Sequence, residues 1–317
     1  MRVLVLGASG FVGRHLLAEC RSRGDVLCGT YRPGEEIPAE PSVTWSSLDL
    51  LDTPSIEAAL EAARPEGIVH LAGQANVAQA HRDPLETFRL NAEGTLRVLD
   101  AQRRVAPRAR TAVVASGEMY GAVPPERLPV TEDQPPDPRT PYGISKACAD
   151  AVAAMAARGW GLSVVRMRPF NHVGEGQRRG FVVPDFASQI AAIERGEQEP
   201  VLSVGNLSPR RDFTDVRDVV RAYREALERG RAGEAYNVCS GRSVSVEEIA
   251  RFLIGRARVP VTIRNEEARR RPQDLDEIRG DASKAKRELG WAPEIPWERS
   301  VQGVLEEWRR GRPGSPR

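Results

Sequence analysis

The sequence predicts an alternating α/β protein, built on a doubly wound parallel sheet and followed by a smaller C-terminal α/β lobe. Two observations support this fold class. Short apolar runs alternate with amphipathic stretches through the first half of the chain, and a glycine-rich turn directly follows the first apolar run. Buried strands are expected at 2–7, 25–31, 43–49, 67–73, 111–117 and 162–171, and helices at 12–23, 53–64, 83–104 and 140–158.

After residue 171 the pattern breaks into shorter elements. We expect a first domain over 1–171, to whose sheet elements from about 215–241 can return, a lobe over 172–310 and a basic tail over 311–317. The proline-rich loop at 124–141 is long for a connection, which is typical of functional or mobile segments. In the lobe, helices are expected at 181–195, 215–230, 245–257, 281–289 and 297–309, and strands at 200–206, 234–241 and 261–266.

Composition excludes several classes of function. The chain has 317 residues and 46 basic against 44 acidic side chains, a net charge of +2, so we expect no nucleic-acid or membrane-surface partner. No apolar run reaches the roughly 18 residues of a membrane span, and no signal peptide precedes the first strand, so we expect a cytoplasmic protein. The cysteines are too scattered for a disulfide framework or a metal site; they are Cys20, Cys28, Cys148 and Cys239.

The turn GASGFVG places glycines at three positions between the first strand and the first helix. Gly7 permits the tight turn, Gly10 lets the backbone approach a pyrophosphate, and Gly13 allows close helix–sheet packing. The N–H groups of the helix start, at Phe11 and Val12, face the same phosphate. This pattern in this position predicts a Rossmann-type dinucleotide site.

The second strand ends in GTYRPG, without the acidic residue that usually holds an adenosine 2′-hydroxyl. Arg32 stands there and can accept a 2′-phosphate, so NADP(H) is favoured and NAD(H) remains an alternative. Asp49 is placed to accept from the adenine amino group, or else to cap the following helix. His70 is interpreted as a core histidine. The other expected cofactor contacts lie at strand ends: Leu50, Leu71, Ala72 and Gly73.

Tyr142 and Lys146 lie one helical turn apart in TPYGISKACAD. A tyrosine exchanges protons poorly at neutral pH unless a neighbouring charge stabilises the phenolate, and the lysine can supply that charge. Ser116, at the end of the fifth strand, is placed to hydrogen-bond the substrate oxygen whose proton moves. We therefore predict that these three residues transfer a proton, with Tyr142 and Lys146 also contacting the cofactor.

The glycine loop, Ser116 and the Tyr142-x-x-x-Lys146 pair resemble those of the extended short-chain dehydrogenase/reductases that act on nucleotide-sugars. The similarity runs essentially end to end, and RPFNHVGEGQ, FVVPDFASQIAAIE and RRDFTDVRD are most similar to the branch of GDP-6-deoxy-D-mannose reductases. The resemblance implies NAD(P)H-dependent reduction of the 4-keto group of a nucleotide-linked 4-keto-6-deoxy sugar, with GDP-4-keto-6-deoxy-D-mannose converted to GDP-D-rhamnose.

The same resemblance implies substrate contacts. It makes Asn171 a substrate ligand and makes Arg211 and Arg271 candidate diphosphate clamps, since guanidinium groups suit phosphate oxygens. Asn91 matches an asparagine that lies beneath the active site in that family. Glu175 stands where a proline would be expected, and we expect it to add a carboxylate near the sugar pocket.

Three other functions stay open. Glu118, in SGEMYG, stands where the GDP-mannose 4,6-dehydratases have their eliminating base, so this residue is a catalytic candidate and dehydration is the main alternative. A nucleotide-sugar 4-epimerase could use the same Ser/Tyr/Lys site. A regulator that senses NADP(H) without chemistry is the third, although such proteins usually lose the Tyr or Lys that this chain keeps.

We also expect a homodimer. The helix ACADAVAAMAA, at 147–157, is apolar or small nearly all round, so the face turned away from the sheet needs a partner. Relatives suggest that the helices 83–104 and 140–158 pair across a two-fold axis.

Overall fold

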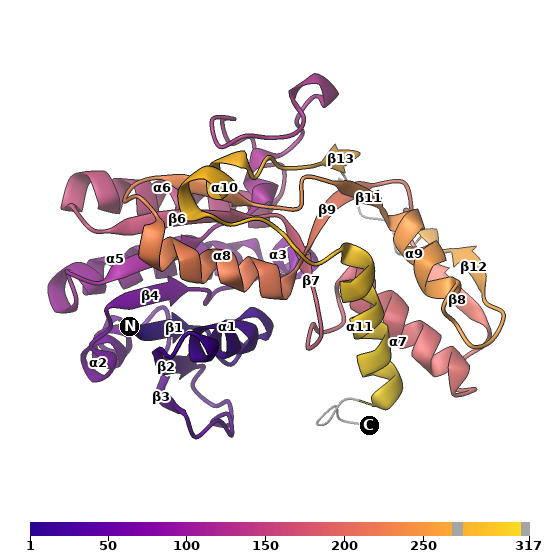
Figure 1. Cartoon of the computed structure of the whole chain (residues 1–317), viewed down its shortest axis with the longest axis horizontal. Coiled ribbons are helices and arrows are strands. Elements are labelled where there is room, and N and C mark those ends of the chain that lie inside the picture. Colours follow the sequence, from indigo (N-terminus) through magenta and orange to yellow (C-terminus); the bar gives the residue numbers. More distant parts are fainter. Residues whose placement is uncertain (268–274, 312–317) are drawn as a thin grey trace.

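The fold is seen in a computed structural model, which describes residues 1–267 and 275–311. A seven-stranded, fully parallel sheet forms its centre, in the order β10-β6-β5-β4-β1-β2-β3 (Figure 1). Apart from the edge strand β3, the strands are mostly buried on both faces, as a doubly wound sheet requires. Their bounds are β1 (Arg2–Leu6), β2 (Val26–Tyr31), β3 (Val43–Ser47), β4 (Gly67–His70), β5 (Arg110–Val114), β6 (Val164–Pro169) and β10 (Ala235–Val238).

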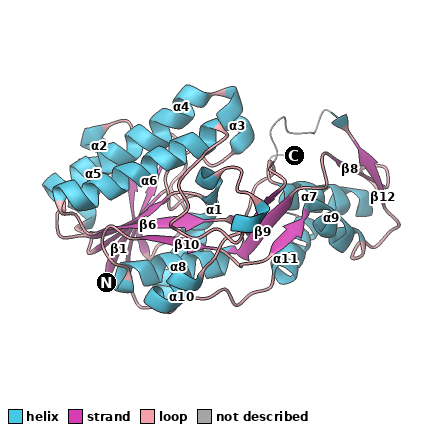
Figure 2. Cartoon of the chain, turned by 90° about the horizontal axis from the view of Figure 1, so that it is seen from above, coloured by secondary structure: helices cyan, strands magenta, loops and turns pink. Residues whose placement is uncertain are grey.

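Helices cover both faces of this sheet (Figure 2). One face carries α2 (Thr53–Ala63), α5 (Gly94–Val105) and α6 (Pro141–Trp160), and the other carries α1 (Phe11–Ser22), α8 (Val216–Arg229) and α10 (Ser283–Leu289). The expected fold class is confirmed. The strand β10 and the helix α8, which follow residue 171 in the chain, belong to this layered structure.

The helix expected at 83–104 is interrupted. It consists of α4 (Pro84–Phe88), one π-helical turn, η1 (Arg89–Glu93), and α5. A short helix, α3 (Val77–Arg82), precedes it. Single π-turns inside helices often occur at functional sites, and this one carries Asn91.

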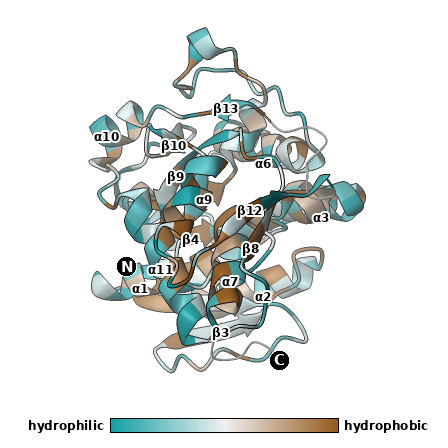
Figure 3. Ribbon diagram, turned by 90° about the vertical axis from the view of Figure 1, so that its right-hand side faces the viewer, coloured by the Kyte–Doolittle hydropathy of each residue, from teal (hydrophilic) through white to brown (hydrophobic). Residues whose placement is uncertain are grey.

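The C-terminal lobe has its own core, built from α7 (Val182–Glu194), α9 (Val246–Ile254) and α11 (Trp297–Arg310). The helix α7 is among its hydrophobic segments (Figure 3). Two small sheets complete it: β8 (Val201–Val204) pairs with β12 (Thr262–Asn265), and β9 (Arg210–Asp215) pairs with β7 (Asn171–Val173), β11 (Ser243–Ser245) and β13 (Glu277–Ile278). Two short 3₁₀ helices, η2 (Gly117–Tyr120) and η3 (Pro125–Arg127), lie outside this lobe. The domain limit at residue 171 stays a prediction.

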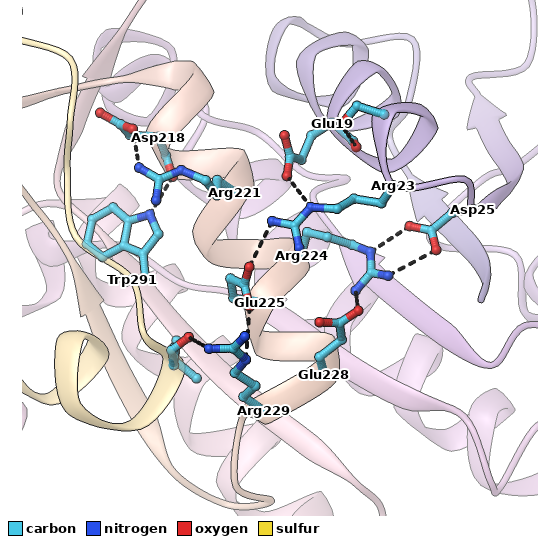
Figure 4. Close-up of polar contacts among 12 residues, drawn as sticks. Glu19, Arg23, Asp25, Asp218, Arg221, Arg224, Glu225, Glu228, Arg229 and Trp291 are labelled. Carbon is cyan, nitrogen blue, oxygen red and sulfur yellow. Dashed lines mark hydrogen bonds and ion pairs between the residues drawn. The ribbon is translucent and has the colours of Figure 1, made fainter.

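A charged network joins α8 to the start of the chain (Figure 4). Arg224 donates to Asp25 at 3.0 Å, with both side chains almost fully buried, and Arg23, the C-cap of α1, pairs with Glu225 at 2.8 Å. Truncating one partner of such a buried pair leaves an uncompensated charge, which typically costs about 3–5 kcal/mol. The network therefore specifies where α8 packs.

The proline-rich loop at 124–141 is tied down in its middle. Val130 bridges to Gly280, and Glu132 accepts a hydrogen bond from the backbone of Asn237 at 2.7 Å.

Within the described residues, no helix is long and apolar enough to cross a membrane. The described residues also contain no group of side chains suited to holding a metal ion.

Candidate active site

The glycine loop has the geometry that a nucleotide phosphate needs. Gly7 has φ +85°, and a Cβ there would lie 2.9 Å from the backbone nitrogen of Ala72. A Cβ on Gly13 would lie 2.5 Å from the carbonyl oxygen of Gly7, so only glycine lets the helix approach the strand this closely. Gly10 is the N-cap of α1 and offers no side-chain acceptor, so the first N–H groups, including those of Phe11 and Val12, stay available to an anion.

The end of β2 and the end of β3 lie beside this loop. The side chain of Arg32 is exposed and pairs with Glu35 at 3.7 Å. Asp49 is exposed and accepts from the backbone of Leu51 at 2.9 Å, while Asp52 and not Asp49 caps α2. The capping alternative for Asp49 is therefore wrong. Leu50 is buried beneath this segment.

At the end of β4, Leu71 and Ala72 are half-buried and Gly73 is exposed. A Cβ on Gly73 would lie 2.5 Å from the side-chain oxygen of Asn91, which explains why a glycine stands there. His70, just before, is buried and hydrogen-bonds to Thr95 at 3.1 Å. Burial lowers the pKa of His70 to about 3, so it is a neutral core residue at physiological pH.

Tyr142 and Lys146 project from the first two turns of α6, whose start is set by Thr140. The Thr140 hydroxyl accepts from the backbone of Gly143 at 2.9 Å, and Pro141 occupies the first helical position. Lys146 is buried and donates to the carbonyl oxygen of Val114, at the end of β5, at 2.9 Å. The helix thereby places both side chains at the carboxyl edge of the sheet, where ligands of such folds bind.

Burial sets the proton affinities of this pair. Desolvation lowers the pKa of Lys146 to about 8. Desolvation also raises the pKa of Tyr142 to about 12, against a hydrogen bond from Ser116 that lowers it, while the charge of Glu118 raises it further. In the chain alone, the Lys146 ammonium donates to a carbonyl and burial dominates the pKa of Tyr142, so the stabilisation of the tyrosinate by Lys146 stays a prediction. Tyr142 is a protonated phenol at neutral pH.

Ser116 is the N-cap of η2 and accepts from the backbone of Glu118 at 3.2 Å. The 3₁₀ turn therefore holds three groups together: the Ser116 hydroxyl, the Tyr142 phenol and the half-buried Glu118. This arrangement can move a proton to or from a substrate oxygen.

The expected substrate residues lie on the strands of the lobe. Asn171 is exposed at the start of β7, which pairs with β9. On β9, Arg210 pairs with Glu248 at 3.1 Å and Arg211 donates to the carbonyl of Leu275 at 2.7 Å. Arg210 is thus paired with a carboxylate, whereas Arg211 bonds to a neutral carbonyl. The diphosphate role of Arg211 stays a prediction. Arg271 lies outside the described residues.

Glu175 contacts both α1 and α11. Its carboxylate approaches Arg310 of α11 at 3.4 Å and lies against Gly303, while its carbonyl oxygen hydrogen-bonds to His15 of α1 at 2.7 Å. The side chain thus points from the loop toward α11, and its expected place near the sugar pocket stays a prediction. The residue helps to fix the loop 171–177 between the two parts of the chain.

Comparison with known proteins agrees with this geometry. The family model described as GDP-mannose 4,6 dehydratase matches residues 4–304. A curated GDP-6-deoxy-D-mannose reductase of Pseudomonas aeruginosa is 36% identical over 97% of this chain and 97% of its own. The chain belongs to the GDP-mannose 4,6-dehydratase family, within the extended short-chain dehydrogenase/reductases. The expected family is thereby confirmed.

Other relatives of this chain are named for different activities. GDP-mannose 4,6 dehydratase 1 of Arabidopsis thaliana is 32% identical over 82% of this chain and 72% of its own. Among solved structures, RMD from Pseudomonas aeruginosa complexed with NADPH has a TM-score of 0.84 and 34% identity, covering 98% of this chain and 99% of its own. A UDP-glucose 4-epimerase from Thermus thermophilus complexed with NAD has a TM-score of 0.86 and 26% identity, covering 98% and 100%. NADPH and NAD, bound by these two, are the pair of cofactors that the sequence predicts.

Two residues at the site of this family member are not singled out by the sequence. Gln74 exchanges backbone hydrogen bonds with the Asn91 amide at 2.8 and 2.9 Å, and Ser145 accepts from the same amide at 2.9 Å. The sequence could have indicated these two residues only by their polarity, since Gln74 directly follows Gly73 and Ser145 directly precedes Lys146. They connect the end of β4 to the helix that carries Lys146.

Proposed function

We propose that this protein uses NAD(P)H to reduce the 4-keto group of a GDP-linked 4-keto-6-deoxy sugar, and that it converts GDP-4-keto-6-deoxy-D-mannose to GDP-D-rhamnose. The observation that carries the proposal is the Ser116 hydroxyl close enough to the Tyr142 phenol to lower its pKa, one helical turn from the buried Lys146. The chain-long similarity to a GDP-6-deoxy-D-mannose reductase supports the choice of substrate.

The glycine loop fits a dinucleotide, because its turn and close helix approach exclude side chains at Gly7 and Gly13. When bound, the nicotinamide cofactor supplies the hydride. Phe11, Val12, Arg32 and Asp49 would hold its phosphates and adenosine, and Leu50, Leu71, Ala72 and Gly73 would line the rest.

Tyr142 donates the proton to the C4 oxygen as the alkoxide forms, and Ser116 orients that oxygen. A phenol with a pKa of about 12 is fully protonated at pH 7, which suits a donor in the reductive direction. Lys146, with a pKa of about 8, is mostly cationic at pH 7 and can stabilise the tyrosinate left after transfer. Lys146 would also contact the nicotinamide ribose.

The lobe over 172–310 would bind the nucleotide-sugar, while 1–171 with α8 and β10 would bind the cofactor. Asn171 would contact the sugar, and Arg211 and Arg271 would hold the diphosphate. In keeping with this role, Asn171 is exposed at the start of β7, next to the Phe170 that follows β6.

Dehydration is the second candidate function. Elimination needs a carboxylate beside the sugar, and Glu118 is close enough to Tyr142 to raise its pKa. The match to the GDP-mannose 4,6 dehydratase model supports this alternative as well. A 4-epimerase would use the same three residues and recycle its cofactor.

We propose that the protein forms a homodimer through the faces of α4, α5 and α6. Five large apolar side chains are exposed on these helices, and Leu85 alone is 77% exposed; they are Leu85, Phe88, Leu96, Ile144 and Met155. Exposed apolar side chains gathered on neighbouring helices are typical of a surface that packs against a partner. A two-fold axis would pair the helices with their own copies.

Incubation with NADPH and enzymatically prepared GDP-4-keto-6-deoxy-D-mannose tests the reaction. A reductase oxidises one NADPH for each sugar reduced, seen as loss of absorbance and as a GDP-D-rhamnose product. A parallel incubation with GDP-D-mannose and no added reductant tests dehydration, because a dehydratase forms the 4-keto sugar without net change of cofactor. Cofactor binding with neither product would instead support the regulator.

A further inference from the structure

A tight turn directly after β2 brings Glu35 back onto Arg32. The backbone N–H of Glu35 donates to the carbonyl oxygen of Arg32 at 3.0 Å, and Gly34 has φ +82°. Proline at the second position and a positive-φ glycine at the third are the residues that a type II turn requires. The four residues Arg32–Glu35, RPGE, therefore determine that the carboxylate of Glu35 lies over the end of the strand.

Three donors converge on that carboxylate. Its Oε2 accepts from the Ser9 hydroxyl at 3.1 Å and from the backbone N–H of Arg32 at 3.3 Å, and its Oε1 lies 3.7 Å from Arg32 Nε. Ser9 belongs to the glycine loop, between Gly7 and Gly10. A hydroxyl, a backbone N–H and a guanidinium from two separate segments thus meet at one anion.

This set of donors is also what a phosphate monoester would bind. Guanidinium groups and N–H donors form their strongest hydrogen bonds with charged oxygens. The side chain of Arg32 is 79% exposed and that of Glu35 is 40% exposed. Exposed pairs of this kind contribute only about 0–1 kcal/mol, so a stronger anion can displace the carboxylate.

We propose that Glu35 determines the choice between NADP(H) and NAD(H), because its carboxylate competes with the 2′-phosphate of NADP(H) for Ser9 and Arg32. A 2′-phosphate must displace Glu35 and lie near its negative charge. A 2′-hydroxyl carries no charge and can donate to the carboxylate. Arg32 and Glu35 therefore act in opposite directions, the first favouring NADP(H) and the second NAD(H). This inference rests on the proposed cofactor site and is independent of the sugar reaction.

Binding measurements on the whole chain test the inference without any turnover. Glu35→Gln keeps the size of the side chain and the turn but removes the charge. We expect the Kd for NADPH to fall about two- to fivefold, the size of a partly screened charge pair, with no gain for NADH. The same difference is expected by calorimetry between 2′-phospho-ADP-ribose and ADP-ribose, which lack the nicotinamide.

Glu36→Gln is the matched control, since it removes the same charge one residue along an exposed segment. If Glu36→Gln changed the ratio of the Kd values for NADPH and NADH as much as Glu35→Gln does, the effect would be one of general charge, and the proposal would be overturned. An unchanged ratio with Glu35→Gln would also overturn it. In an Arg32→Ala background, the gain in NADPH affinity from Glu35→Gln should be smaller, because the phosphate no longer meets a guanidinium. If the protein does not reduce the keto sugar, the ratio of the two Kd values still decides the role of Glu35. If that ratio overturns the role of Glu35, the outcome of the reduction assay is unaffected.

Discussion

The side-chain amide of Asn91 donates a hydrogen bond of 2.9 Å to the hydroxyl of Ser145, the residue directly before Lys146. The amide oxygen of Asn91 accepts from the backbone of Gln74 at 2.8 Å. One side chain on a π-turn therefore joins the loop after β4 to the helix that carries the proposed proton donor. We therefore expect Asn91 to position Lys146 and the loop after β4.

Asn91→Ala should remove three hydrogen bonds, two to the backbone of the half-buried Gln74 and one to the hydroxyl of the buried Ser145. Such changes cost about 1–3 kcal/mol for each unsatisfied buried group, so we expect a lower free energy of unfolding in urea together with a lower kcat and weaker NADPH binding. Gln102→Ala is the control, because Gln102 is equally buried on α5 and bonds to Ala109 and Thr111 instead. It should lose stability but keep the kcat of the remaining folded protein; equal kcat losses in both variants would contradict a positioning role.

Tyr142→Phe keeps the ring and removes the phenolic proton. If Tyr142 is the proton donor, the rate of keto reduction should fall about 10²–10⁴-fold, the usual contribution of general acid catalysis, while the Kd for NADPH stays near wild type. Stopped-flow reduction and fluorescence titration measure the two quantities separately. The control is Tyr236→Phe, which removes from β10 a hydroxyl that donates to Glu288 of α10. It should leave the reduction rate and the Kd for NADPH unchanged. Near-normal reduction by Tyr142→Phe would show that the proton comes from another group.

Glu118→Gln separates the two candidate reactions. The substitution removes the charge that raises the pKa of Tyr142 and keeps the size of the side chain. Under the reductase function, keto reduction should fall less than about tenfold, since the donor stays in place. Under the dehydratase function, release of the 4-keto product from GDP-D-mannose should disappear. Product analysis by chromatography decides between them.

His70 should make the protein sensitive to acid. Its pKa is about 3 in the folded chain and about 6.5 when unfolded, so between these values only the unfolded chain binds the proton. Stability therefore falls as the pH falls through this window, by up to about 1.4 kcal/mol per pH unit. His70→Gln should reduce the loss of unfolding free energy between pH 7 and 5 by up to about 2 kcal/mol, measured by urea titration. His81→Gln, at an exposed site, should not change this loss.

A charge on the apolar helix face should disrupt the dimer. Leu96→Glu and Phe88→Glu each place a carboxylate within the proposed two-fold contact, where burial without a partner is costly. We expect both variants to sediment as monomers at micromolar concentration, where the wild type sediments as a dimer. Val259→Glu changes an equally exposed apolar residue in the loop between α9 and β12, and it should remain dimeric. A monomeric wild type would contradict the proposal.

The sequence alone was sufficient for features that depend on spacing along one element. The glycines at 7, 10 and 13, the single-turn separation of Tyr142 and Lys146, and the buried parallel strands all follow from local periodicity. Backbone geometry fixes how far apart such residues lie, whatever the rest of the chain does.

Only the tertiary structure decided which distant segments meet. Glu175 turns toward Arg310, Asn91 on its π-turn reaches Ser145, and Glu35 meets Ser9 across 26 residues. It also decided the proton affinities, since burial of Tyr142 outweighs the hydrogen bond from Ser116. These outcomes depend on the path of the whole chain and on how much water each group loses, and local spacing carries neither quantity.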